Sequence, residues 1–246
     1  MAKQPFVLGV IIARQGSKGV PGKNVAKIGR RMLLELAILS ATKAKTISRV
    51  ILSTDSPQMA AIGKKCGADV PFLRPKHLAQ DKTHTPPVIE HAVRFVEKEE
   101  GRKVDIVVTL QPTSPFRKAE HIDAAIRLLL KDPRLDSAVT VKKAFFPPFW
   151  MFRAKNNTLV PLVQDGVDYS LKERQQLPLI YQPNGAVFAS RRELLMKKGV
   201  LFSAFSGGKT GFSEMDSLSS IDIDHAIDLV MAKTVLKDHP ELLKDS

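Results

Sequence analysis

The sequence predicts an α/β fold in which a mainly parallel sheet is covered by helices on both faces. Apolar runs of strand length alternate along the chain with segments of helical periodicity, an order typical of βαβ units. The strand-like runs show little alternation of apolar and polar residues, as expected for strands buried on both faces. The 246 residues suit one such domain, with room for a small insertion.

Each element is predicted from its local pattern. Helix 57–66 has Gly67 just past its end, and helix 86–99 begins with proline and places Val88, Ala92 and Val96 on one face. The other helices are predicted at 32–44, 119–131, from 191 onward and at 226–236. Strands are predicted at 6–13, 50–53, 70–73, 104–110, 137–141, 185–189 and 221–223.

The alternation stops near residue 142, and the segment 144–183 is predicted to be an inserted arm. It is rich in proline and aromatic residues, and Asn156-Asn157 is a typical hairpin turn. Its aromatic side chains could form a local core, but leaving them in water would be costly, so we expect a subunit contact. These are Phe145, Phe146, Phe149 and Trp150.

Charge, apolar run lengths and cysteine content predict which partners the protein binds and in which cellular compartment it works. The formal net charge of +13 favours anionic partners such as nucleotides and acidic sugars. The basic pairs are scattered and form no stripe, so nucleic acid is not expected as a partner. No apolar run approaches the roughly 20 residues that span a bilayer, so no membrane contact is expected. A single cysteine, Cys66, and a first apolar run that reads as a strand and not a signal peptide indicate a cytoplasmic protein.

The loop after the first predicted strand, residues 13–24, has the composition of a phosphate-binding loop. Its three glycines allow backbone N–H groups to approach an anion, and Arg14, Lys18 and Lys23 add positive charge. The glycine spacing differs from the dinucleotide-binding motif, and Asn24 after Lys23 differs from the P-loop motif. Without further information the loop could also be a flexible turn.

Three polar residues elsewhere stand out. Asp222 and Asp224 lie two apart on a predicted extended segment, so their carboxylates would project to one side and could hold a hard cation. Asp224 could instead cap the last helix. Gln111 follows a buried strand in a loop bounded by two prolines, and its amide could read a base or cap its own loop.

Taken together and in order, several segments resemble the acylneuraminate cytidylyltransferases, the CMP-sialic acid synthetases. The resemblance runs from about residue 7 to 229. It rests on the 13–24 loop, Leu73-Arg74-Pro75, Leu78-Ala79-x-Asp81, Leu110-Gln111-Pro112-Thr113-Ser114-Pro115-Phe116-Arg117, Arg174-Gln175-Gln176-Leu177-Pro178, Pro183-Asn184-Gly185-Ala186 and Ser220-Ile221-Asp222-Ile223-Asp224.

The resemblance implies a Rossmann-like three-layer nucleotidyltransferase fold with a small dimerisation arm, and a homodimer. It implies transfer of CMP from CTP to the C2 hydroxyl of a sialic acid-type nonulosonic acid, with release of pyrophosphate. CTP would be contacted by Arg14, Ser17, Lys23, Asn24, Arg74, Thr85 and Gln111. The sugar would be contacted by Gln111, Arg174 and Asn184. Asp222 and Asp224 would hold Mg²⁺, or Mn²⁺, and would act in catalysis with Arg14 and Lys23.

Two departures from the family pattern concern the sugar. Trp150 stands where the family often has lysine, and Phe188 stands where it has tyrosine. Both changes make the expected sugar pocket less polar, so legionaminate and pseudaminate are also candidate substrates. Kdo is a further alternative acidic sugar. The sequence leaves open a different nucleotide such as GTP, a non-catalytic nucleotide-sugar sensor, and a nucleic-acid binder. The retained aspartate pair and basic loop argue against the sensor.

Overall fold

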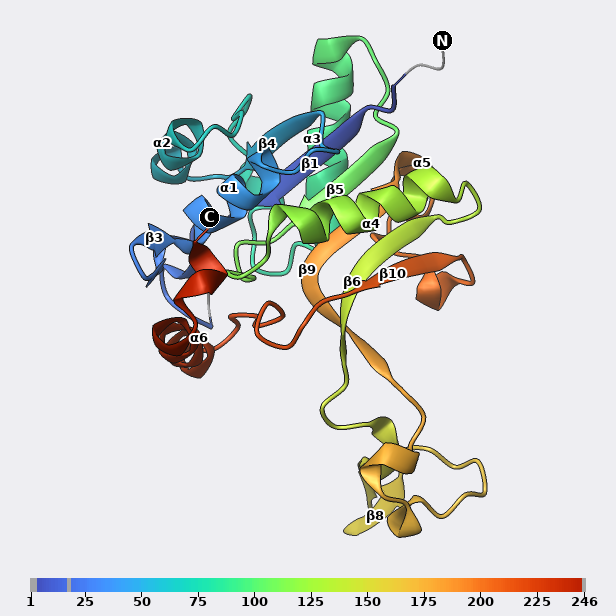
Figure 1. Cartoon of the computed structure of the whole chain (residues 1–246). Coiled ribbons are helices and arrows are strands. Elements are labelled where there is room, and N and C mark those ends of the chain that lie inside the picture. Colours follow the sequence, from blue (N-terminus) through green and yellow to red (C-terminus); the bar gives the residue numbers. More distant parts are fainter. Residues whose placement is uncertain (1–3, 17–18, 245–246) are drawn as a thin grey trace.

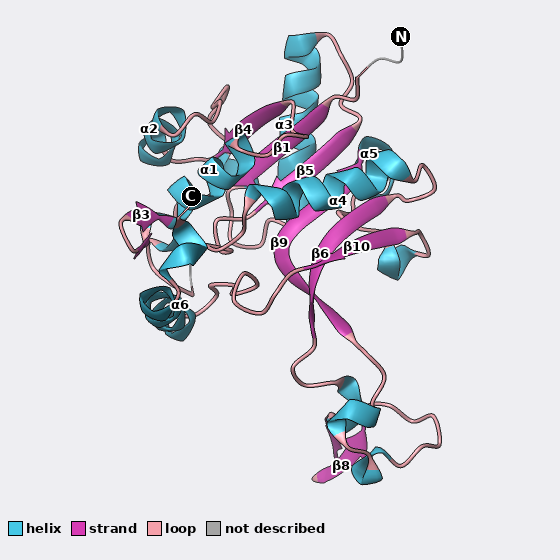
Figure 2. Cartoon of the chain, viewed as in Figure 1, coloured by secondary structure: helices cyan, strands magenta, loops and turns pink. Residues whose placement is uncertain are grey.

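The computed structural model describes residues 4–16 and 19–244, which form a three-layer α/β body with one projecting arm (Figure 1). The central sheet contains β1 (Val7–Ile12), β4 (Arg49–Ser53), β5 (Ile106–Leu110), β6 (Ser137–Lys143), β9 (Tyr181–Arg191) and β10 (Thr210–Glu214). The six strands lie in the order β10-β6-β9-β5-β1-β4. Only β9 runs antiparallel to its neighbours, so the predicted mainly parallel sheet is confirmed (Figure 2).

Helices cover both faces of this sheet, as predicted. They are α1 (Leu33–Thr42), α2 (Pro57–Lys65), α3 (Thr85–Glu100), α4 (Ala119–Lys131) and α5 (Arg192–Lys198). A sixth helix, α6 (Ala226–Asp238), packs with residues of α1 in a separate apolar cluster. Val7 and Ile11 of β1 pack with α1, α2 and α4, whereas Leu8 and Val10 pack with α3 and α5. Successive side chains of a strand point to opposite faces, so one apolar run serves two cores. No helix within residues 4–16 and 19–244 is long and apolar enough to span a bilayer.

The carboxyl ends of β1, β4 and β5 meet at one edge of the sheet. Ile12 and Ser53 are register partners, and Ile11 of β1 pairs with Leu110 of β5. A third apolar cluster lies near this edge, where α1 and α6 pack with Phe116 and Ile223 and with the small hairpin β2 (Lys27–Ile28) and β3 (Arg31–Met32). The loops that leave the three strands are therefore brought together.

Two predicted strands are absent from the structure, and one observed strand of the central sheet was not predicted. Residues 221–223 are not a strand: Ile223 N–H donates to Thr113 O, but no ladder forms. The last strand is instead β10, which pairs with β6 at the open edge of the sheet. Its residues include exposed Phe212 and a glycine, so they lack the apolar run that marks the inner strands. Residues 70–73 are also not a strand, although Asp69 forms one isolated bridge with Ile51.

The arm leaves the body between β6 and β9 and hangs away from the sheet (Figure 1). Its root is closed by a hydrogen bond from Ala144 N–H to Ile180 O of 2.9 Å. Within it, β7 (Phe152–Lys155) and β8 (Thr158–Pro161) pair antiparallel. Asn156 and Asn157 join them with φ of 48° and 60°, so the predicted hairpin turn is confirmed.

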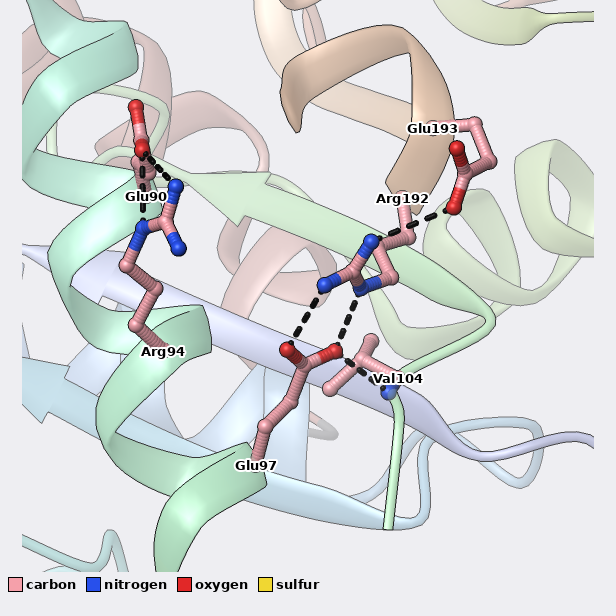
Figure 3. Close-up of polar contacts among 6 residues, drawn as sticks. All are labelled: Glu90, Arg94, Glu97, Val104, Arg192 and Glu193. Atoms are coloured by element: carbon pink, nitrogen blue, oxygen red, sulfur yellow. Dashed lines mark hydrogen bonds and ion pairs between the residues drawn. The ribbon is translucent and has the colours of Figure 1, made fainter. Parts of the chain in front are cut away.

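A half-buried ion pair fastens α5 to α3 (Figure 3). Arg192 Nε and Nη2 donate to the Glu97 carboxylate at 2.5 and 2.9 Å, and Val104 N–H donates to the same carboxylate at 3.0 Å. The Arg192 and Glu97 side chains are 16% and 14% exposed. Burial raises the pKa of Glu97, but the hydrogen bonds from Arg192 and Val104 outweigh it and hold the pKa below its usual value.

We expect Glu97→Gln to lower the free energy of unfolding at pH 7 by about 2 kcal/mol, because it removes a charge-assisted hydrogen-bonded pair. The folded pKa is lower than the unfolded pKa. The pair therefore stabilises the fold above the unfolded pKa of about 4.3 and loses that effect as pH falls through the folded pKa. Urea unfolding across pH measures the difference. Glu90→Gln is the control, since its partner Arg94 is 64% exposed and the expected loss is below about 0.5 kcal/mol.

Candidate active site

A cavity of about 480 Å³ opens at the carboxyl edge of the sheet. The loops after β1 and β5 form it together with the segment 74–83 between α2 and α3, the start of α3 and the segment before α6. Its lining includes the predicted residues Arg14, Lys23, Asn24, Arg74, Thr85, Gln111 and Asp224. Residues from distant parts of the chain thus share one cavity, whose position agrees with the rule that ligands bind beyond the carboxyl ends of parallel strands.

The loop after β1 follows a defined path. Gly16 and Gly22 have φ of +83° and +65°, values that favour glycine. Asn24 Nδ2 donates to Arg14 O at 3.0 Å, and Gln15 N–H donates to Asp55 Oδ1 at 2.9 Å. Asp55, which was not predicted as a site residue, therefore helps to hold the loop. Predicted Ser17 lies outside the described residues.

Lys23 joins this loop to the segment before α6. Its Nζ donates to Ile223 O at 2.8 Å and lies 3.3 Å from Asp224 Oδ1. The Lys23 side chain is 15% exposed, whereas that of Asp224 is 65% exposed. The ammonium group is thus held by a carbonyl and a carboxylate at the cavity wall, where an anionic ligand could reach it.

Asp222 lies deeper than Asp224. Its Oδ1 is buried and accepts no hydrogen bond from the described residues. Burial raises the pKa of Asp222, a hydrogen bond from Thr113 opposes the shift, and the nearby charge of Asp224 adds to it. A buried carboxylate oxygen without a donor lies ready for a cation, so the pair fits a hard divalent ion. The described residues contain no group of three or more acidic, histidine or cysteine side chains that could hold a metal ion, so other ligands would come from substrate and water.

Arg74 is fixed at the far wall. Its side chain is only 6% exposed, and its guanidinium donates to Ser53 Oγ at 3.0 Å and to Ser53 O. Burial lowers the pKa of Arg74 to about 10, while Asp55 opposes the shift and Arg14 adds to it. The group still carries its charge at neutral pH. Arg14 itself pairs with Asp81 at 2.5 Å, so its cation is oriented before any ligand binds.

The end of the cavity between β5 and α3 combines polar and apolar groups. Gln111 follows β5 and Thr85 is the first residue of α3. Ile12 and Val88 add apolar surface to the same lining. An amide beside apolar surface is the arrangement that can both stack and hydrogen-bond a planar base.

Two predicted sugar contacts do not line this cavity. Asn184 is 5% exposed and its amide is already occupied: Oδ1 accepts from Thr140 Oγ1 at 2.7 Å, and Nδ2 donates to Ser220 Oγ at 2.9 Å. It supports the segment that leads to Asp222. Arg174 lies on the arm, where its guanidinium sits 4.6 Å from the Phe145 ring centroid and donates to Phe145 O.

Neither substituted position lines this cavity either. Trp150 lies on the arm, where its Nε1 donates to Tyr169 O at 3.0 Å, and Phe188 stacks on Phe202 at 5.7 Å.

Sequence reasoning assigned no role to several residues that build the site. Thr113 and His225 line the cavity, and Thr113 O accepts the Ile223 N–H at 2.9 Å. Arg117 is 2% exposed, and its Nη1 donates to Gln111 O and Ala186 O, both at 2.9 Å. Position gave a partial signal, because Thr113 and Arg117 share a segment with Gln111 and His225 follows Asp224.

Comparisons with known proteins agree with this geometry. Residues 8–199 match the Cytidylyltransferase family. The N-acylneuraminate cytidylyltransferase of Escherichia coli O18:K1:H7 is 32% identical over 229 residues, which cover 93% of this chain and 52% of that protein. The CMP-N,N'-diacetyllegionaminic acid synthase of Legionella pneumophila is 31% identical over 243 residues, which cover 96% of this chain and 99% of that protein.

A solved structure shows the same fold. The structure of CMP:2-keto-3-deoxy-manno-octonic acid synthetase complexed with CTP superposes with a TM-score of 0.68, covering 95% of this chain and 99% of the other. The two sequences are 15% identical, so this likeness concerns the fold alone. It agrees with the predicted nucleotidyltransferase architecture.

Proposed function

Because this chain belongs to the cytidylyltransferase family and is therefore a nucleotidyltransferase, we propose that it transfers CMP from CTP to the C2 hydroxyl of a sialic acid-type nonulosonic acid. The observation that supports this most directly is the shared cavity. Its lining brings together the cations Arg14, Lys23 and Arg74, the carboxylate of Asp224 beside Lys23, and the amide of Gln111. Relatives named for sialic and for legionaminic acid keep both sugars as candidates.

In this proposal the two ends of the cavity have different tasks. Arg14, Lys23 and the loop amides, with Ser17, bind the phosphates by charge-assisted hydrogen bonds. Asn24, Arg74, Thr85 and Gln111 face the ribose and the cytosine. The C2 hydroxyl oxygen of the sugar attacks the α-phosphorus and its proton passes to water, while the bond from the α-phosphorus to the bridging oxygen breaks and pyrophosphate leaves with the electron pair of that bond. The chain acts by positioning the reactants and by placing fixed charge near the reacting phosphate.

Asp222 and Asp224 are proposed to hold Mg²⁺ or Mn²⁺. The bound ion would neutralise charge on the triphosphate. The two carboxylates would fix its place beside Lys23, which already contacts Asp224. A donor set of two carboxylates suits Mg²⁺, which keeps several water and phosphate ligands.

Pyrophosphate release tests the reaction. The protein is incubated with Mg²⁺, one of CTP, GTP, UTP or ATP, and one acid from a panel of N-acetylneuraminate, legionaminate, pseudaminate and Kdo. Release with CTP and a nonulosonate is expected. Release with another nucleotide would contradict the cytosine assignment, and silence across the panel from folded protein would contradict the proposed reaction and favour a nucleotide-sugar sensor.

The arm is proposed to join two copies into a cytoplasmic homodimer and to carry Arg174 to a sugar carboxylate. Phe145, Phe146, Leu159 and Leu171 of the arm are 66–80% exposed, a density of apolar surface that favours association. The arm hangs away from the body that contains the cavity (Figure 1). In the proposed dimer, Arg174 would therefore reach the cavity of the second subunit.

We expect Leu159→Asp/Leu171→Asp to be monomeric where the unchanged protein is a dimer, because two charges in an apolar contact stay unpaired. Light scattering after size exclusion at micromolar concentration gives the mass. The control is Leu130→Asp, which places one charge at an apolar side chain of the body that is 45% exposed. A monomeric mass for the unchanged protein would contradict the dimer.

A further inference from the structure

A second cavity, of about 330 Å³, lies between the end of α1 and the start of α4. It shares no lining residue with the first cavity, at the carboxyl edge of the sheet, which we call the nucleotide cavity after its proposed ligand. Five basic and two acidic side chains line it. The basic ones are Lys43, Lys45, Arg117, Lys118 and Arg127. The proposed reaction uses none of them.

Of the two acidic groups, Asp123 is already engaged by the protein. Its carboxylate accepts from Thr46 N–H at 2.9 Å, from Thr46 Oγ1 at 2.6 Å and from Lys45 N–H at 3.2 Å, and it lies 3.6 Å from Arg127. The other, Glu120, is 70% exposed and lies 4.0 Å from His121. Neither carboxylate therefore neutralises Lys45 or Lys118, whose ammonium groups have no ion-pair partner among the described residues.

Arg117 supplies an independent sign of a missing ligand. Its side chain is among the largest fully buried ones, yet its Nη2 has no hydrogen-bond partner among the described residues. Nη1 faces the sheet, and Nε donates to Ser40 Oγ at 3.3 Å. In a planar guanidinium the Nε–H and one Nη2–H point the same way. Ser40 lines the second cavity, so the unpartnered Nη2 is directed to that side.

The first turn of α4 adds backbone donors. Ala119 and Glu120 begin this 13-residue helix and line the cavity. The first amides of an α-helix have no partner within the helix and carry the positive end of its dipole. The second cavity is therefore lined by the buried guanidinium of Arg117, by Lys45 and Lys118 and by the first turn of α4. Such a set of donors can bind a tetrahedral oxyanion.

We propose that this cavity is a second anion site, which binds a small phosphate group between Lys45, Lys118 and the buried guanidinium of Arg117. The site lies behind the nucleotide cavity: Arg117 also donates to the carbonyl of Gln111. It does not depend on the proposed reaction, because its residues are separate from those that would bind CTP.

Calorimetric titration with inorganic phosphate, without nucleotide or metal, tests the proposal. Lys45→Gln/Lys118→Gln removes two charges of the second cavity, and Arg14→Gln/Lys23→Gln removes two of the nucleotide cavity. Lys98→Gln/Lys131→Gln is the charge-matched control on exposed residues outside both cavities. We expect the first variant to weaken one phosphate-binding event by about tenfold or more, and the other two to keep that event.

Three outcomes would overturn the proposal. They are no phosphate binding by the unchanged protein, equal binding by the Lys45/Lys118 variant, and loss of binding only in the Arg14/Lys23 variant. Thermal unfolding of each variant establishes that it folds. Should the Lys45/Lys118 variant fail to fold, a crystal of the unchanged protein soaked in phosphate decides the matter: density within hydrogen-bond distance of Arg117 Nη2 is expected, and its absence contradicts the site.

Discussion

Asp222→Asn and Asp224→Asn are each expected to lower kcat/KM for pyrophosphate release by about 100-fold or more, a loss typical of removing charge that acts on the transition state. Each change keeps the size of the side chain and removes one negative charge. Asp222 has a buried carboxylate oxygen that accepts no hydrogen bond from the described residues, and Asp224 forms an ion pair with Lys23. The neutral amides would hold a divalent cation poorly, because Mg²⁺ prefers carboxylate oxygen.

The measurement is steady-state kinetics at several Mg²⁺ concentrations, joined to Mn²⁺ binding followed by electron paramagnetic resonance. Both variants should bind Mn²⁺ more weakly in the presence of CTP. Asp238→Asn, an exposed change at the end of α6, is the control and should behave as the unchanged protein. Unchanged activity and unchanged metal binding in Asp222→Asn or Asp224→Asn would remove that residue from the site.

Gly19→Ala is expected to reduce CTP affinity and turnover together, with kcat/KM lower by about 100-fold. A Cβ at this position would lie 2.3 Å from Asp224 O. The obstacle is backbone and cannot swing aside as a flexible side chain would. The loop or the Asp224 segment must therefore move, and a displacement of about 1 Å in a catalytic arrangement can cost such a factor.

Gly101→Ala is the matched control for Gly19→Ala. Gly101 has a φ of +60°, and a Cβ added there would touch no other atom. The only expected cost of alanine is therefore that of the left-handed backbone conformation, about 1–2 kcal/mol. It lies at the far end of α3, away from the cavity. Kinetics and thermal unfolding of both variants separate the two effects: stability falls in both, activity in Gly19→Ala alone. Normal activity in Gly19→Ala would contradict the close packing of the loop on Asp224.

Much of this architecture could be predicted from the sequence. Buried strands such as β1 and β5 and amphipathic helices such as α3 carry their signal in local periodicity, which needs no knowledge of neighbours. The edge strand β10 was missed because an exposed strand with a polar, glycine-containing sequence has no such pattern. The antiparallel direction of β9 was also invisible, since strand direction depends on which element the chain returns beside.

The candidate site shows the same division. Arg14, Lys23, Arg74, Gln111 and the two aspartates were predicted as separate segments, from residue type and from a family resemblance. All of these except Asp222 line one cavity, because the loops after the parallel strands β1 and β5 lie at the same edge of the sheet. Arg117 had only a partial sequence signal, its place in the same segment as Gln111, because its role depends on contacts with Ser40 and Ala186, which are far away in the chain.

By itself the sequence therefore determined the α/β class and the family, and it predicted most of the polar residues that line the cavity, because periodicity and short motifs depend on neighbouring positions. Only the tertiary structure decided that Asn184 is a buried support with its amide already bonded and that Arg174 stands on a separate arm. Only the tertiary structure, too, revealed an unpartnered guanidinium at a second basic cavity. Burial, hydrogen-bond partners and empty space are relations between distant segments, and they exist only once the chain has folded.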